Sequence, residues 1–312
     1  MKLIARQGMI LVACVALIYG FLLAISLVLV PRPHAERALD TANVAQTIFM
    51  TEPKYIYLNR DPLRSEAQKV VLVGASNVVV GFTPPELAGL LPGDIVVHNL
   101  GIGGANMTEI RQVIDLVQQV QSPKARRREI FVIGIWYGMF NENRVRWNTP
   151  DRHAGDTDID IERYRYGFER RSAAGPVAVV PWRYFGVATT AIYPFLVIDK
   201  LSRDALAWLD PEKVRGPAEL DAAIVGEAQR VASLDYWSKA MGVRAPPLSA
   251  EQFDVLRDAC NAILNEGSRL ILVDLPLPKW HERRSPYDAD YEARKARIVD
   301  ELMRRPGFTA VS

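Results

Sequence analysis

Apolar and polar positions alternate along this chain in a pattern that predicts short buried strands separated by amphipathic helices. Five apolar runs have the length of strands that are buried on both faces. They lie at 69–73, 94–100, 129–135, 269–275 and 308–311. Strands that alternate with helices form a parallel sheet covered on both faces, and such sheets bind ligands at the carboxyl ends of their strands. The pattern therefore predicts an α/β fold with a three-layer parallel sheet.

Two of the helices between these strands have clear apolar faces. The second of them is expected to begin at Ser249, where Gln252 completes a capping box, and to end at Gly267. Cys260 falls on its apolar face and is expected to be a small buried hydrophobe rather than a reactive thiol. A charged helix is expected over 291–304. The apolar face of the first helix consists of Ile110, Val113, Ile114, Val117 and Val120.

The N-terminal segment 10–30 is an uninterrupted apolar run of 21 residues without a charged side chain. At about 1.5 Å per residue, a helix of this length spans a hydrocarbon core of roughly 30 Å. It is longer than the apolar region of a cleaved signal peptide, which has about 7–15 residues. We therefore expect an uncleaved membrane anchor, with a cleaved signal or a buried core helix as the alternatives. Lys2 and Arg6 favour a cytoplasmic N-terminus, although Arg32 and Arg37 lie on the other flank.

The rest of the chain divides by composition into three further parts. After an anchor at 1–31, a polar, proline-punctuated stretch at 32–68 is expected to be a stalk or lead-in. The α/β domain is expected over 69–312. Its strand–helix rhythm breaks at about 139–248, which predicts an inserted subdomain.

The second half of this insertion, 176–201, is apolar apart from Arg183, Asp199 and Lys200. Arg183 and two prolines argue against a second membrane-spanning helix. Two interpretations remain: a buried part of the inserted subdomain, or a face that meets the membrane surface or a membrane partner.

Composition narrows the classes of function. The 38 Lys and Arg residues against 36 Asp and Glu give a formal net charge of only +2, which gives no support for nucleic-acid binding driven by counterion release. A hydrophobic content of 49% excludes a disordered chain. Two cysteines and four histidines, all far apart, exclude a disulfide scaffold and a zinc finger. We expect neither a metal nor another cofactor.

Two loops at predicted strand ends could carry chemistry. Ser76 and Asn77 follow the first strand, where a serine in a tight turn exposes its oxygen and neighbouring backbone N–H groups face a developing oxyanion. Serine–asparagine pairs are also common turn caps, so this signal alone is weak. The glycine-rich stretch 99–104 follows the next strand and lets a ligand approach the backbone closely. It lacks the spacing of the dinucleotide-binding fingerprint.

Together these two loops resemble the first two sequence blocks of the SGNH (GDSL-like) hydrolase and acyltransferase superfamily. The stretch Gly74–Pro84 is more similar to membrane-anchored members of DltD or exopolysaccharide O-acetyltransferase type, which work beside membrane-bound O-acyltransferases. Asp274–His281 also resembles a segment of these proteins. The resemblance implies an SGNH-type, flavodoxin-like sheet with Ser76 as the nucleophile and Gly101 as an oxyanion donor beside Asn77.

The sequence departs from this family in its third block, which is G-x-N-D in the family and contributes an asparagine to the oxyanion hole. Gly134-Ile135-Trp136-Tyr137 stands there instead. Asn141 or Asn143 in the following loop could substitute, but at a different spacing. Trp136 is expected either to face the substrate or to serve packing.

The second departure concerns the general base, which lies in a D-x-x-H block after the last strand of the family. No such block follows the strand at 308–311, so either the chain continues beyond this sequence or the base comes from elsewhere. Of the four histidines, His281 lies nearest a strand's carboxyl end, and Asp274 precedes it by seven residues. A histidine oriented by a carboxylate is what activation of a serine requires. These two residues can meet only if the chain folds back after Pro278. The alternative roles for His281 are substrate positioning and a structural or solvent-facing role.

The resemblance implies a membrane-anchored serine O-acyltransferase that transfers an acetyl or similar acyl group to a cell-envelope polysaccharide or other polymer. Its expected partner is a membrane-bound O-acyltransferase. It would lie in the bacterial inner membrane as a single-pass protein with its globular domain on the periplasmic or extracellular side. An esterase of the same fold is one alternative, and a non-catalytic, polymer-binding partner of the membrane enzyme is another.

Overall fold

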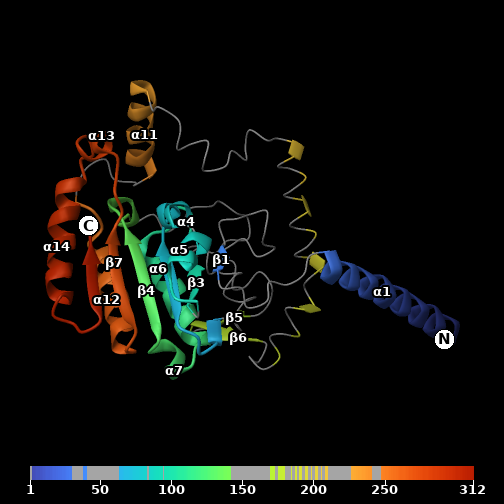
Figure 1. Ribbon diagram of the computed structural model, residues 1–312. Coiled ribbons are helices and arrows are strands. Elements are labelled where there is room, and N and C mark those ends of the chain that lie inside the picture. Colours follow the sequence, from blue (N-terminus) through green and yellow to red (C-terminus); the bar gives the residue numbers. More distant parts are fainter. Residues whose placement is uncertain are drawn as a thin grey trace.

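The computed structural model describes residues 2–29, 38–40, 63–82, 84–93, 95–141, 169–172, 175–179, 226–240 and 247–312, with single residues and pairs between 184 and 209. A parallel sheet forms the centre of the described part (Figure 1). Its strand order is β1-β3-β2-β4-β7-β8, and every neighbouring pair is parallel. The α/β fold with a parallel sheet is therefore confirmed. The strands are β1 (Ala38–Asp40), β2 (Lys69–Gly74), β3 (Val96–Asn99), β4 (Glu129–Ile135), β7 (Arg269–Asp274) and β8 (Phe308–Val311).

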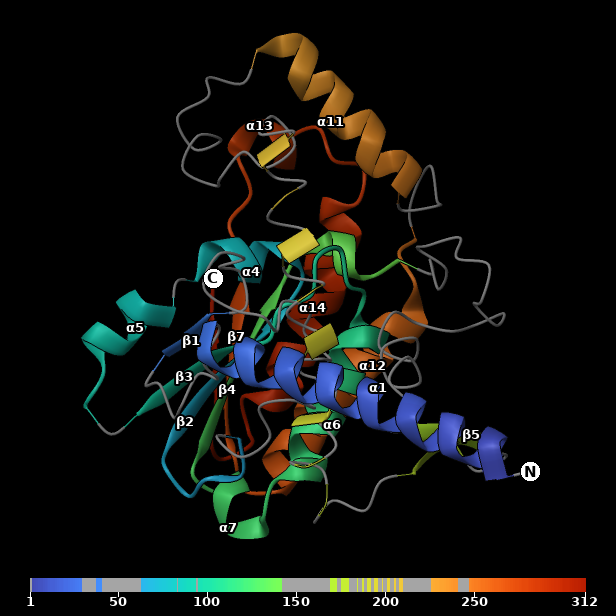
Figure 2. The same ribbon diagram turned by 90° about the vertical axis from the view of Figure 1, so that its right-hand side faces the viewer.

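Helices cover both faces of this sheet (Figures 1 and 2). Side chains on successive strand residues point to opposite faces, so each strand contributes to two apolar cores. Val71 and Val73 of β2 lie in the larger core, and Val70 and Leu72 lie in the smaller one. The larger core is closed by α6 (Met107–Val120), α12 (Ala250–Asn265) and α14 (Asp288–Leu302). The smaller core is closed by α4 (Ser76–Gly81) and α5 (Pro84–Leu90).

The predicted features of α12 are only partly correct. The helix follows Ser249 and ends before Gly267, which adopts a φ of +81°. Cys260 is fully buried, as expected. The predicted capping box is wrong, because the Ser249 hydroxyl makes no cap and Gln252 instead accepts a hydrogen bond from the Thr108 N–H, at 3.0 Å. A capping box does open α6, where the side chains of Asn106 and Glu109 bond each other's backbone N–H groups.

The order of the strands defines where a ligand site is expected. From β2 the chain moves to β3 on one side and then returns to β4 on the other, so the topology reverses between β2 and β4. In open α/β sheets, ligands bind at the carboxyl ends of the strands at such a switch point. Here α4 lies closely over this junction. A Cβ on Gly74 or on Gly134 would come within 2.3 Å or 2.4 Å of Val78 Cγ2, so glycine allows both strands to approach the helix.

The N-terminal helix α1 (Lys2–Leu29) is separate from these layers (Figure 1). Its span Leu3–Val28 is long and apolar enough to cross a membrane. Its side chains are almost all exposed, so it is no core helix of the described protein. By length and composition it is compatible with a membrane anchor or a signal sequence.

The stretch expected to be a stalk is not wholly external, because Ala38–Asp40 pairs with β3 at one edge of the sheet and Leu63 is buried in the larger core. Of the insertion expected at about 139–248, the structure describes an antiparallel hairpin and one longer helix. Most of the remainder, including the charged residues 151–168, lies outside the described residues, apart from the single residues and pairs between 184 and 209. These elements are β5 (Glu169–Ser172), β6 (Gly175–Ala178) and α11 (Glu227–Ala240).

Helix α11 lies beyond the carboxyl ends of the strands, against the short helix α13 (Lys279–Glu282) that follows β7 (Figures 1 and 2). Glu227 of α11 forms an ion pair with Arg284 at 2.5 Å. The Arg230 guanidinium lies 5.8 Å from the ring centroid of Trp280. Helix α11 therefore lies at the same end of the sheet as the expected site.

Candidate functional site

Ser76 is the first residue of α4 and follows β2 after a single residue, Ala75. Its side chain is partly buried, and its Oγ lies 3.5 Å from Asn77 Oδ1. Ala75 caps α4 without a side-chain hydrogen bond, and the first N–H groups of a helix have no intrahelical acceptor. Ser76 and Asn77 therefore combine a hydroxyl with backbone donors on one turn. Among the described residues, no histidine hydrogen-bonds to the Ser76 hydroxyl.

Asn99, at the end of β3, fixes the position of α4. Its buried side-chain amide donates to the carbonyl oxygens of Val78 and Phe82, each at 3.0 Å. Its Oδ1 accepts a hydrogen bond from the Gly101 N–H, also at 3.0 Å. Gly101 thus lies beside α4 as expected, and a Cβ there would come within 2.8 Å of Val79 Cγ2. Its N–H, the expected oxyanion donor, is already engaged by Asn99.

His281 is buried on α13 and contacts Tyr137, which follows β4. The Tyr137 hydroxyl hydrogen-bonds to Nε2 of His281, and the two ring centroids are 5.6 Å apart. Burial lowers the pKa of His281 and raises the pKa of Tyr137 to about 12. A neutral imidazole is therefore held by a protonated phenol at the carboxyl end of β4.

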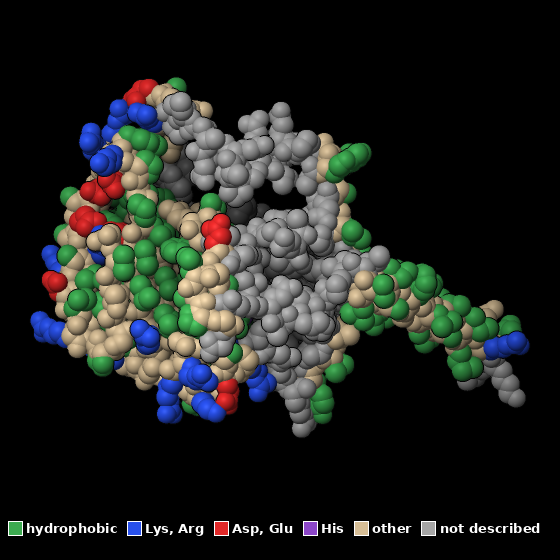
Figure 3. Space-filling model, in the orientation of Figure 1, with side chains coloured by type: hydrophobic (Ala, Val, Ile, Leu, Met, Phe, Trp, Pro, Cys, Tyr) green, Lys and Arg blue, Asp and Glu red, His purple; other side chains and the backbone are tan. Residues whose placement is uncertain are grey.

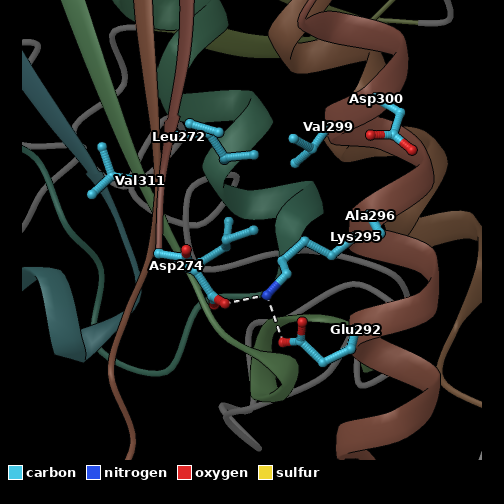
Figure 4. A pocket seen from close by; sticks show the side chains of 11 residues that line it. Leu272, Asp274, Glu292, Lys295, Ala296, Val299, Asp300 and Val311 are labelled. Atoms are coloured by element: carbon cyan, nitrogen blue, oxygen red, sulfur yellow. Dashed lines mark hydrogen bonds and ion pairs between the residues drawn. The ribbon is translucent and has the colours of Figure 1, made fainter.

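Asp274 is turned toward α14 and is held there by two partners (Figure 4). Its Oδ2 forms an ion pair with Lys295, and its Oδ1 accepts a hydrogen bond from the Tyr291 hydroxyl at 2.6 Å. Glu292 also pairs with Lys295, at 2.5 Å. Burial disfavours the charged form of Lys295, but these two carboxylates outweigh burial and raise its pKa. The expected pairing of Asp274 with His281 is therefore not formed.

Asp274, Glu292 and Lys295 line a pocket of about 260 Å³ between α14 and the carboxyl ends of β7 and β8. Figure 4 shows that Lys295 reaches from α14 to both carboxylates across this pocket, with Val299 and Leu272 on its apolar side. Ser76 and His281 do not line it. The pocket is thus distinct from the switch point between β2 and β4.

Trp136 and Asn141 both contribute to packing in the turn after β4. Trp136 is 4% exposed and packs edge-on against Tyr137, with 4.9 Å between ring centroids. A Cβ on Gly138 would come within 2.4 Å of the indole, so the turn closes tightly over it. Asn141 is also buried, and its amide donates to the Gly138 carbonyl at 2.6 Å. Asn143, the other proposed substitute for the family asparagine, lies outside the described residues.

The remaining candidates for chemistry are inert or not described. His98 on β3 is fully buried, and burial lowers its pKa to about 3, with Lys69 adding to the effect. Burial raises the pKa of the Cys260 thiol to about 12. His34 and His153 lie outside the described residues. Within the described part of the chain, no three His, Cys, Asp or Glu side chains gather closely enough to hold a metal ion.

Sequence reasoning missed three residues that organise this edge of the sheet. Asn99 has a local signal, because an asparagine at a strand end followed by Gly101 allows such a side-chain bond to a turn. Tyr137 lies beside the predicted Trp136 and could have been considered as a partner of His281. Lys295 has no comparable signal, because it lies on α14, 21 residues after Asp274, and only the tertiary fold brings the two side chains together.

Comparison of the chain with protein-family models, with curated proteins and with solved structures found no match.

Proposed function

We propose that this protein is a membrane-anchored serine O-acyltransferase that modifies a cell-envelope polysaccharide or polymer, with Ser76 as its nucleophile. The observation that carries the proposal is the position of Ser76. It is partly exposed in the first turn of α4, directly after β2, and α4 covers the junction where the strand order reverses. The sequence resemblance to SGNH proteins supports the same role for this serine.

In this proposal, the Ser76 oxygen attacks the acyl carbonyl of an activated donor and forms an acyl-serine as the donor's leaving group departs. The N–H groups of Ser76 and Asn77 stabilise the negative oxygen of the tetrahedral intermediate. A hydroxyl of the polymer then attacks the acyl-serine and regenerates the Ser76 hydroxyl. If water were the acceptor, the same steps would describe an esterase.

His281 is the proposed proton acceptor, because its lowered pKa keeps the imidazole neutral near pH 7. Its Nε2 is held by Tyr137. The serine proton therefore reaches His281 either after Tyr137 turns away or through the Tyr137 hydroxyl. Asp274 takes no part in this scheme, because Lys295 and Tyr291 hold both of its oxygens.

The proposal includes a place for the protein in the cell. Helix α1 remains as an anchor in the bacterial inner membrane, and the globular domain lies on the periplasmic or extracellular side. A membrane-bound O-acyltransferase is the proposed partner that supplies the acyl group at the bilayer. Co-purification in mild detergent tests this partner, and recovery of a lone monomer would contradict it.

A second candidate function is a non-catalytic, polymer-binding partner of the membrane enzyme. The observation that favours it is the environment of Ser76, since no histidine of the described residues bonds its hydroxyl. The engagement of the Gly101 N–H by Asn99 favours it as well. Polymer binding without acyl transfer would need neither an activated serine nor an oxyanion hole.

A fluorophosphonate probe separates these two functions, because it labels only activated serines. We expect the wild-type chain to be labelled and Ser76→Ala to lose the label. Ser122→Ala is the matched control, since Ser122 is the N-cap of α7 (Pro123–Arg126) and has no proposed role in chemistry. Wild-type labelling no stronger than that of Ser76→Ala would contradict catalysis. Release of free acid from an acyl ester, measured with and without an oligosaccharide acceptor, then separates transfer from hydrolysis.

A further inference from the structure

Helix α1 makes contact with one other described part of the chain in a way that bears on the membrane. The Tyr19 hydroxyl donates a hydrogen bond to the backbone carbonyl of Ala191. The rings of Tyr19 and Phe195 are tilted, with 6.5 Å between their centroids, which is within the range of aromatic pairs. Residues far apart in the sequence, from the N-terminal helix and from the insertion, therefore lie side by side.

The depth of this contact follows from the geometry of α1. Tyr19 lies ten residues before the end of the helix at Leu29, which is about 15 Å along its axis. The hydrocarbon core of a bilayer is roughly 30 Å thick. If α1 spans the membrane, Tyr19 and the residues that contact it lie within the hydrocarbon and not at its surface.

The first part of the contacted stretch, 184–198, has the composition that such a position requires. Its described residues have helical backbone, and it contains no charged side chain, whereas charged residues begin at Asp199. Three of its large apolar side chains point into solvent rather than into a core, with exposed fractions from 55% to 71%. These side chains are Val187, Phe195 and Ile198.

The spacing of these three residues and Ala191 corresponds to one side of a helix. Val187, Ala191, Phe195 and Ile198 follow one another at intervals of four, four and three residues. Phe195 contacts Tyr19 and is still 62% exposed, so α1 covers this face only in part. Most large apolar side chains that are exposed in the described protein belong to α1 or to this stretch. Figure 3 shows the apolar surface that α1 presents along its length.

We propose that the uncharged stretch 184–198 is a second membrane-embedded element, whose exposed side chains at Val187, Phe195 and Ile198 contact lipid acyl chains beside α1. Lipid is the expected neighbour of these side chains, because they lie beside α1, which itself would be surrounded by lipid. At the depth of Tyr19 the surroundings are hydrocarbon, and an unpaired hydroxyl there is costly, which the bond to the Ala191 carbonyl avoids. The chain thus enters the bilayer twice, once as a spanning helix and once through this apolar stretch, and the charged residues from Asp199 onward lie outside it.

This inference rests on α1 remaining as a membrane anchor and not on the chemistry of Ser76. The test uses the full chain alone in phosphatidylcholine nanodiscs, with an environment-sensitive nitrobenzoxadiazole label on single cysteines. Phe195→Cys and Ile198→Cys are made in a Cys14→Ala background, and buried Cys260 stays unlabelled because its thiol is inaccessible. Arg297→Cys on the exposed side of α14 is the water-facing control, and native Cys14 on α1 is the control for the anchor.

We expect labels at 195 and 198 to emit at shorter wavelength than the label at 297. We also expect a roughly twofold or greater loss of their emission with spin-labelled lipid, since acyl chains touch the label only within the hydrocarbon. Water-like emission at 195 and 198 beside lipid-like emission at Cys14 overturns the inference and leaves the anchor intact. Water-like emission at Cys14 as well overturns both. Blue-shifted emission without lipid quenching means that protein covers the stretch, which also overturns the inference.

Discussion

Polar groups lie in different environments at the two ends of the parallel strands, which we call the amino edge and the carboxyl edge of the sheet. At the carboxyl edge, Ser76 is partly exposed and His281 and Tyr137 form a neutral pair. At the amino edge, the Lys69 ammonium and the Glu129 carboxyl group lie 3.9 Å apart, and both side chains are completely buried. A buried charge is tolerated only when partners surround it. The amino-edge cluster is thus closed to solvent, whereas the carboxyl edge has the partly exposed Ser76 as well as the Asp274–Lys295 ion pair.

The amino-edge cluster is closed by hydrogen bonds from three segments. Lys69 Nζ donates to the backbone carbonyls of Ser65 and Ala67. Gln121, after α6, donates to Glu129. Burial raises the pKa of Glu129 to about 8, although Lys69 and Gln121 oppose the shift, and burial lowers the pKa of Lys69. Such shifts can mark functional sites, but this cluster lies at the end of the sheet away from the switch point.

Of the four substitutions, Lys69→Met is expected to lower the free energy of unfolding most. We expect the free energy of unfolding to fall by about 3–4 kcal/mol, because the Ser65 and Ala67 carbonyls lose their donor and Glu129 loses the cation beside it. Urea unfolding followed by tryptophan fluorescence in detergent measures this loss. Lys124→Met is the matched control and should change little, since Lys124 pairs with Glu66 at an exposed position. Equal effects of both variants would contradict a special role for the buried pair.

Glu129→Gln tests whether the raised pKa of Glu129 makes the stability of the protein depend on pH. The folded-state pKa of about 8 lies above the ordinary carboxyl value of 4.5, so the folded chain keeps a proton that the unfolded chain has lost. The stability from this group is complete below pH 4.5 and is lost as the pH rises to about 8. We expect roughly 3 kcal/mol of pH-dependent stability to disappear in Glu129→Gln. Urea unfolding of the wild type and the variant at pH 5, 6, 7 and 8 measures this difference. If the free energy of unfolding changed with pH in the same way in both proteins, Glu129 would not be the source of the pH dependence.

Asn99→Ala tests whether the Asn99 side chain holds α4, and with it Ser76, in position. The substitution leaves the carbonyls of Val78 and Phe82 and the N–H of Gly101 without this partner, so we expect a loss of about 2–3 kcal/mol. Because α4 carries Ser76, labelling by the fluorophosphonate probe should fall as well, even at urea concentrations where the chain is folded. Unchanged labelling in a destabilised variant would show that Asn99 does not position the serine.

Tyr137→Phe is the smallest change and separates chemistry from stability at this edge. We expect a loss of only about 1–2 kcal/mol, because one buried hydrogen bond to His281 is removed while the ring remains. The pH profile of probe labelling should change, since the hydroxyl that holds Nε2 is gone. A profile identical to that of the wild type would remove Tyr137 and His281 from the proposed proton path.

Much of the fold could be predicted from the sequence, because buried parallel strands consist of continuous apolar runs. The runs 129–135 and 308–311 agree with β4 and β8 at both ends. The capping box at Ser249 failed for a tertiary reason, since Thr108 of α6 takes the Gln252 side chain. A local pattern in the sequence cannot reveal a competing partner that lies 144 residues away.

The candidate site was less predictable, for a related reason. The position of Ser76 at a strand end follows from the local pattern, because a strand and a helix meet there. The pairing of Asp274 with His281 rested on their proximity in the sequence, but the side chain of Asp274 lies on the face covered by α14. Strand alternation places Asp274 on the same face as Leu270 and Leu272, but the helix that covers this face comes from another part of the chain.

The close contact between Val78 and the two glycines of β2 and β4 has a consequence for motion at the site. A six-residue helix on a surface loop would ordinarily fray within microseconds, since so short a helix has little stability of its own. Here α4 rests against two strand backbones without intervening side chains and is tied to a third strand by Asn99. It should therefore open only when the sheet opens. The amide protons of Val78 and Val79 would then exchange with solvent as slowly as those of the central strands.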